Sequence, residues 1–81
     1  MKNERILVVD DDREIVRAIA ILLEQEGFHP VRAYDGMQAL EILAKEQIQL
    51  VLIDVMMPKM DGLSAIMKIR ERQNIPIIVL S

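Results

Sequence analysis

Residues 6–12 (ILVVDDD) and residues 50–54 (LVLID) decide the fold, because each is a short apolar run that ends in aspartate. Continuous runs of valine, isoleucine and leucine are typical of strands buried on both faces of a parallel sheet. In open α/β sheets, ligand sites lie at the carboxyl ends of such strands. Two neighbouring strands of this kind are therefore expected to bring Asp10, Asp11 and Asp54 together at one edge of the sheet.

The composition indicates one small globular domain. The chain has 81 residues, of which 52% are hydrophobic and 28% charged, a profile of a folded domain rather than a disordered segment. The formal net charge of −3 argues against a nucleic-acid-binding surface in these residues. The chain has no cysteine, which excludes disulfide and thiolate chemistry, and no apolar run approaches the roughly 20 residues that span a bilayer. We expect a cytoplasmic protein with no membrane partner.

A helix is expected over about residues 12–26, directly after the first acidic run. Its apolar positions recur at helical spacing: Ile15, Val16, Ile19, Leu22 and Leu23. Two residues are candidates for its N-cap, because Asp11 has capping-box spacing to Glu14 and Asp12 is equally placed. Gly27 suits the left-handed position that follows the end of a helix.

The remaining segments continue the alternation of strands and helices. Residues 28–33 form a weaker strand, and the proline inside it favours the sheet edge, where a missing N–H is tolerated. A capping-box pattern at residues 35–38 opens a second helix that runs to about Lys45, and a third helix ends near Arg72. Residues 77–80 (IIVL) form a fourth buried strand. This βαβαβαβ order predicts an α/β fold with a parallel sheet in the strand order 2-1-3-4.

The sequence ends directly after the fourth predicted strand. An apolar strand rarely lies at an exposed sheet edge, because its unpaired N–H and C=O groups invite pairing with other chains. We therefore expect residues 1–81 to be a fragment of a longer domain, without its fifth strand and last two helices. The fragment is expected to self-associate as a homodimer or a higher oligomer. The alternative is a natural minimal domain that dimerises.

A cluster of three carboxylates at one sheet edge indicates a divalent cation. Like charges a few ångströms apart raise one another's pKa, and a hard cation such as Mg²⁺ relieves that repulsion. With Asp10 and Asp11 assigned to the metal, Asp54 is left to accept a phosphoryl group, because carboxylates form acyl phosphates. A backbone carbonyl in the loop of Val55 and Met56 is placed to complete an octahedral shell.

Three motifs in the chain resemble the receiver domain of two-component response regulators, most closely the OmpR/PhoB type. They are residues 6–12, residues 52–62 (LIDVMMPKMDG) and residues 76–81 (PIIVLS), and the resemblance covers essentially the whole chain. It implies a flavodoxin-like fold and a phosphoacceptor signalling module rather than an enzyme. It also implies a sensor histidine kinase as partner, and a parent protein that regulates transcription by binding DNA through an output domain absent from these residues.

The resemblance also assigns roles to individual residues. Asp54 is the expected phosphoacceptor and a metal ligand, Asp11 binds Mg²⁺ directly, Asp10 binds it through water, and Met56 contributes its main-chain carbonyl. Ser81 occupies the position of the family's switch hydroxyl; on its own it is equally well an ordinary hydroxyl at the end of a strand. The family's phosphate-pairing lysine and aromatic switch partner lie on the fifth strand, so we expect the 81-residue chain to be impaired in switching.

Two other functions stay open at this point. The enzymatic alternative is a Mg²⁺-dependent phosphohydrolase with Asp54 as nucleophile. Such enzymes tend to place a second acid two residues after the nucleophile, where this chain has Met56. The other alternative is a self-assembling structural fragment. Asp12, the third acid of its run, is expected to cap the first helix or face solvent rather than bind metal.

Overall fold

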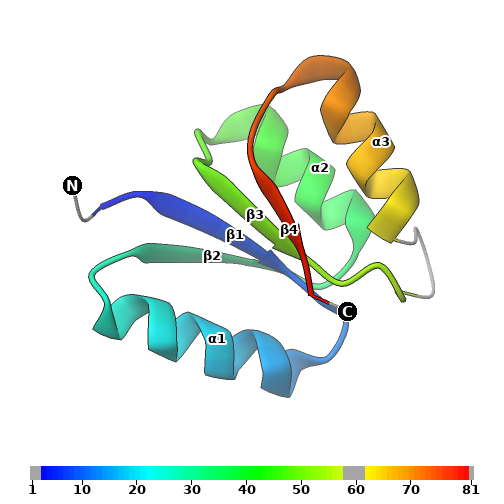
Figure 1. Ribbon diagram of the computed structural model, residues 1–81. Coiled ribbons are helices and arrows are strands. Elements are labelled where there is room, and N and C mark those ends of the chain that lie inside the picture. The colour runs from blue at the N-terminus through cyan, green and yellow to red at the C-terminus, as the bar shows by residue number, and fades with distance from the viewer. Residues whose placement is uncertain (1–2, 58–61, 81) are drawn as a thin grey trace.

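The computed structural model describes residues 3–57 and 62–80, which form a parallel sheet with helices on both faces (Figure 1). Strands and helices alternate along the chain. Their bounds are β1 Arg5–Val9, α1 Arg13–Gln25, β2 His29–Ala33, α2 Gly36–Lys45, β3 Leu50–Ile53, α3 Gly62–Arg72 and β4 Ile77–Val79. The strands lie in the order β2-β1-β3-β4 and pair in parallel, which confirms the predicted fold class.

The strand register brings the carboxyl ends of three strands to the same edge. Val9, the last residue of β1, pairs with Ala33 of β2 on one side and with Ile53 of β3 on the other. The hydrogen bonds continue one residue further, since the Asp10 N–H donates to the Ala33 carbonyl at 3.2 Å and the Asp54 N–H to the Val9 carbonyl at 3.0 Å. Asp10 and Asp54 therefore leave adjacent strands at the same level.

Helices lie on both faces of the sheet: α1 lies on one face, and α2 and α3 lie on the other (Figure 1). Side chains of a strand alternate between faces. Leu7 and Val9 of β1 belong to a core cluster that also contains Leu43 of α2 and Ile69 of α3. Val16 of α1 is fully buried outside that cluster, on the opposite side. The sequence expectation of strands buried on both faces is confirmed for β1.

Side-chain caps fix where α1 and α2 begin. The Asp12 carboxylate accepts hydrogen bonds from two N–H groups in the first turn of α1, the shorter at 3.0 Å, so Asp12 rather than Asp11 is the N-cap. The Asp35 carboxylate accepts from the Gln38 N–H at 2.8 Å and caps α2. Gly27 has φ of 90°, the left-handed conformation predicted for the residue after α1.

Two of the five apolar positions predicted along α1 are not buried against the sheet. Ile15 and Leu22 are exposed, Leu22 to 61% of its surface, although both belong to the apolar positions that recur at helical spacing in the sequence. Val16 and the small Ala20 occupy the side of α1 that packs on the sheet instead. Ile15 and Leu22 therefore belong to an apolar stripe of α1 that faces solvent.

The fourth strand is shorter and more exposed than predicted. β4 ends at Val79 rather than at residue 80, and Ile78 and Val79 are exposed, Ile78 to 52%. Within the described part of the chain, β4 pairs with β3 alone and lies at one end of the sheet. None of the described helices is long and apolar enough to cross a membrane.

Candidate metal centre

Three carboxylates meet at the carboxyl edge of the sheet. Asp10 and Asp11 follow β1, Asp54 follows β3, and one carboxylate oxygen of each lies within 4.8 Å of the other two. The predicted juxtaposition of these side chains is confirmed. Oxygens this close are able to share one small hard cation, and carboxylate oxygens are the ligands that Mg²⁺ takes in proteins.

Asp10 is the buried member of the cluster, with 4% of its surface exposed. Burial raises the pKa of Asp10, and the negative charges of Asp54 and Asp11 raise it further. The Asp12 N–H donates a 2.9 Å hydrogen bond to Oδ1 of Asp10, which opposes these effects because it favours the ionised form. A cation between the three carboxylates removes the repulsion that disfavours their full ionisation.

Two hydrogen bonds from main-chain N–H groups hold the loop that follows β3 beside Asp54. The Met56 N–H donates to Oδ1 of Asp54 at 2.9 Å. The Gly62 N–H donates to the Val55 carbonyl at 3.2 Å and ties the start of α3 to the same loop. The Met56 main chain therefore lies beside the cluster, while its side chain is exposed to solvent. The role of its carbonyl as a metal ligand stays a prediction.

The remaining acids and polar residues of the sequence motifs lie apart from this cluster or outside the described residues. Asp12 has the capping role predicted for it and does not belong to the cluster. Ser81 lies outside the described residues, so its predicted function as a switch hydroxyl stays a prediction. Lys59 and Asp61, in the motif loop, also lie outside the described part of the chain.

Two contacts at the site edge were not predicted from the sequence. Gly62 lies against the main chain of Asp54, with no room for a Cβ. The Arg13 guanidinium carbon lies 3.9 Å from the centroid of the Tyr34 ring, which joins the start of α1 to the segment after β2. The glycine in the residue 52–62 motif was a signal for the first contact. No local pattern marks the second, because its residues are far apart in the sequence.

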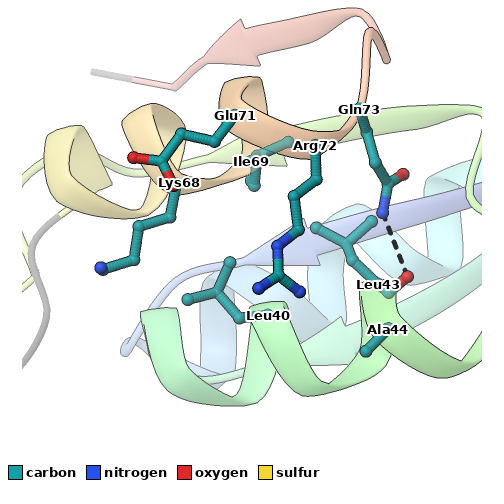
Figure 2. Close-up of a pocket in the computed structure, with 8 residues that line it drawn as sticks. All are labelled: Leu40, Leu43, Ala44, Lys68, Ile69, Glu71, Arg72 and Gln73. Carbon is teal, nitrogen blue, oxygen red and sulfur yellow. Dashed lines mark hydrogen bonds between the residues drawn. The ribbon is translucent and has the colours of Figure 1, made fainter.

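A separate pocket of about 220 Å³ lies between α2 and α3. Figure 2 shows its apolar floor and the long polar side chains at its rim. Its lining residues are Leu40, Leu43, Ala44, Lys68, Ile69, Glu71, Arg72 and Gln73. The Gln73 side-chain amide donates to the Leu43 carbonyl at 3.2 Å and links the two helices (Figure 2). None of the three clustered aspartates lines this pocket, so it is distinct from the candidate metal centre.

Known proteins with similar sequences are named as response regulators or as transcriptional regulatory proteins. The transcriptional regulatory protein CpxR of Escherichia coli K12 is 46% identical over 77 residues, which are 95% of this chain. Response regulator GtcR of Aneurinibacillus migulanus is 35% identical over 79 residues, or 98% of the chain. This chain spans 33% of the length of both relatives.

Solved receiver structures have the same fold. A response regulator receiver protein from Pseudomonas putida superimposes with a TM-score of 0.93 at 30% identity, over all of this chain and 69% of its own. Response regulator TrrA from Thermotoga maritima, crystallised in complex with Mg²⁺ and BeF, has a TM-score of 0.88 at 34% identity, over 94% of this chain and 67% of that one.

The family model of the response regulator receiver domain matches residues 6–81. The match includes residues 6–9 of β1, all of β3 and the three aspartates that follow these strands, a cluster typical of the Mg²⁺ site of receivers. It supports a signalling module and sets aside the phosphohydrolase alternative. The chain belongs to the response regulator receiver domains, which are phosphorylated by histidine kinases.

Proposed function

We propose that Asp54 accepts a phosphoryl group from the phosphohistidine of a sensor histidine kinase, with Mg²⁺ bound at the aspartate cluster. The observation that carries this proposal is the approach of the three carboxylates to within 4.8 Å at the end of two adjacent strands. In the transfer, the phosphorus–nitrogen bond breaks and a phosphorus–oxygen bond to Asp54 forms. The imidazole keeps the bonding electron pair and takes up a proton.

In this proposal the ligands divide according to burial. Asp11 and Asp54 would hold Mg²⁺ directly; Asp11 is exposed and Asp54 half-buried, so both are accessible to a cation from solvent. Oδ1 of the buried Asp10 already accepts a hydrogen bond from the chain, which favours contact through water. The Met56 carbonyl would supply a further ligand; the support is that the Met56 N–H donates to Oδ1 of Asp54, which keeps the main chain of Met56 beside the cluster. When bound, a divalent cation would offset the negative charge of the three carboxylates, which otherwise repels an incoming phosphoryl group.

We further propose that Ser81 contacts the phosphoryl group as the switch hydroxyl, and that the parent protein regulates transcription. The support for the second point is that the relative CpxR is named as a transcriptional regulatory protein, while this chain spans a third of its length. DNA binding then belongs to an output domain outside the receiver, in keeping with the net charge of −3 of these 81 residues.

The exposed apolar stripe of α1 is the proposed docking surface for the kinase. It includes Ile15 and Leu22, which are seven residues apart and so lie on one side of the helix. The stripe begins next to the aspartate cluster, because α1 starts at Arg13, directly after the acidic run. A partner seated on α1 therefore reaches the site with its phosphohistidine.

The phosphoacceptor proposal is tested by intact-mass spectrometry after incubation with acetyl phosphate and Mg²⁺. One added phosphoryl group is expected on the wild-type chain, and none on Asp54→Asn or when the metal is chelated. Modification that persists in Asp54→Asn, or that is unaffected by chelation, would contradict the proposal.

For the 81-residue polypeptide itself, we propose self-association through β4 and impaired switching. The support is the exposure of Ile78 and Val79 on a strand that lies at the end of the described sheet. Light scattering across a concentration series should show dimers or larger species, and Ile78→Lys should reduce them. Met67→Lys, at an exposed position on α3, is the matched control.

Two outcomes would contradict these proposals. A chain that stays monomeric at all concentrations contradicts self-association. An oligomeric state that changes when the chain is phosphorylated contradicts impaired switching.

A further inference from the structure

A cation–aromatic contact lies beside the aspartate cluster. Arg13 is the first residue of α1, two positions after Asp11, and its guanidinium carbon lies 3.9 Å from the centroid of the Tyr34 ring. Tyr34 directly follows β2, whose last residue, Ala33, accepts a hydrogen bond from the Asp10 N–H. The contact therefore flanks the carboxyl edge of the sheet on the β2 side.

The Tyr34 end of this contact is held in place by α2. The Tyr34 N–H donates to the side-chain oxygen of Gln38 at 2.8 Å, and the Gln38 N–H donates in turn to Asp35 at 2.8 Å. Tyr34 is half-buried, whereas Arg13 is exposed. The main chain of Tyr34 is thus anchored to α2, and the guanidinium is the more solvent-exposed partner of the contact.

The charge of Arg13 has two possible partners, the carboxylates of the acidic run and the ring of Tyr34. Arg13 follows the acidic run directly in the chain, at the start of α1. Carboxylates attract an always-charged guanidinium, and guanidinium groups match carboxylates well. Nevertheless, among the described residues Arg13 makes no ion pair with an acid, and its charge lies over the Tyr34 ring instead. The ring face supplies an alternative attraction for the cation.

We propose that Tyr34 is a positioning residue that holds Arg13 away from the aspartate cluster and so keeps the cluster open to a divalent cation. This inference rests on the proposed Mg²⁺ site. Without the ring, the guanidinium is released to pair with the carboxylates and competes with the metal. From the strength of exposed cation–π contacts, the loss in Mg²⁺ affinity should be about two- to fivefold.

The test is a double-mutant cycle read by calorimetric titration with Mg²⁺. Tyr34→Leu should weaken binding about two- to fivefold, whereas Tyr34→Phe, which keeps the ring, should bind like wild type. In the Arg13→Gln background, Tyr34→Leu should have no further effect, because no guanidinium remains to compete. Circular dichroism of each variant verifies that it is folded.

A second readout is the proton NMR of the Arg13 side chain, which should show ring-current shifts that disappear in Tyr34→Leu and persist in Tyr34→Phe. Unchanged affinity in Tyr34→Leu, or equal weakening with and without Arg13, would overturn the positioning role alone. Failure of the wild-type chain to bind Mg²⁺ would overturn the proposed metal site and this inference together.

Discussion

Gly62 lies so close to Asp54 that a Cβ built on the glycine would sit 2.3 Å from the Asp54 carbonyl oxygen. It would lie equally close to the Cα of Val55. Both neighbours are main-chain atoms and have no rotamer by which to move away. The start of α3 and the main chain that follows β3 are therefore packed backbone to backbone, in the residue that carries the Asp54 carboxylate.

Gly62→Ala should destabilise the domain and damage the metal site in one step. The added methyl group forces α3 and the Asp54 strand end apart, an overpacking change that costs about 1–3 kcal/mol. Because Asp54 moves, Mg²⁺ should bind at least about tenfold more weakly, as when a ligand loses its supporting contacts. Urea denaturation and Mg²⁺ titration measure the two effects.

The neighbouring Leu63→Ala is the control for this substitution, because Leu63 is exposed on the same turn of α3. Its change in unfolding free energy should stay within about 0.5 kcal/mol. A Gly62→Ala variant with wild-type stability and wild-type Mg²⁺ affinity would contradict the tight contact described above.

Asp12→Ala should destabilise α1 without a specific effect on the metal site. The carboxylate of Asp12 accepts hydrogen bonds from the first turn, and the loss of such a cap costs about 0.5–2 kcal/mol. Asp12→Ser keeps a capping oxygen and should retain most of the stability. Both variants remove the same negative charge, so we expect them to bind Mg²⁺ with equal affinity. A large difference in Mg²⁺ affinity between the two variants would show that Asp12 does more than cap α1.

Asp10→Asn should stabilise the metal-free domain at neutral pH. Burial, and then the charges of Asp54 and Asp11, raise the pKa of Asp10, so the folded state binds a proton more tightly than the unfolded state does. Stability therefore falls as the pH rises from the usual aspartate range through the raised pKa, and asparagine removes this loss. Thermal melting of both proteins without metal should show a difference that grows with pH and disappears at about pH 3.

The same substitution should weaken Mg²⁺ binding, because the neutral amide leaves the cluster one charge short. Metal should accordingly stabilise the wild-type chain more than it stabilises Asp10→Asn. A destabilised Asp10→Asn at neutral pH, measured without metal, would show that the carboxylate is not under the repulsion described.

Leu22→Glu should slow phosphotransfer from the kinase while leaving modification by acetyl phosphate unchanged. Leu22 is 61% exposed on the apolar stripe of α1, and a buried interface contact of this kind is worth roughly tenfold in affinity. Met67→Glu is the matched control, since Met67 is 69% exposed on α3 across the sheet. Equal rates for Leu22→Glu and the control would contradict docking on α1.

The fold and the aspartate cluster were predictable because strong local signals coincide with the topology. The apolar runs of β1 and β3 mark buried parallel strands, and parallel strands that are neighbours must end at the same edge. The caps Asp12 and Asp35 and the left-handed Gly27 are equally local, since each depends on a few neighbouring residues.

The unpredicted features depend on contacts between distant segments. Apolar residues occur on more than one side of α1, so periodicity could not determine that Val16 faces the sheet and Leu22 solvent. The unequal burial of Asp10 and Asp11 follows from where the strand ends, which sequence rules locate only to within a few residues. The contact of Arg13 with Tyr34 joins two elements that no motif connects.

The most direct test of the account is the anomalous scattering of crystals soaked in Mn²⁺, which replaces Mg²⁺ at oxygen sites. We expect one strong peak at the carboxyl edge of the sheet, within direct coordination distance of oxygens of Asp11 and Asp54 and with Asp10 bound to it through water. Ordered carboxylates with no peak among them, or a peak held by other residues, would contradict the shared metal site.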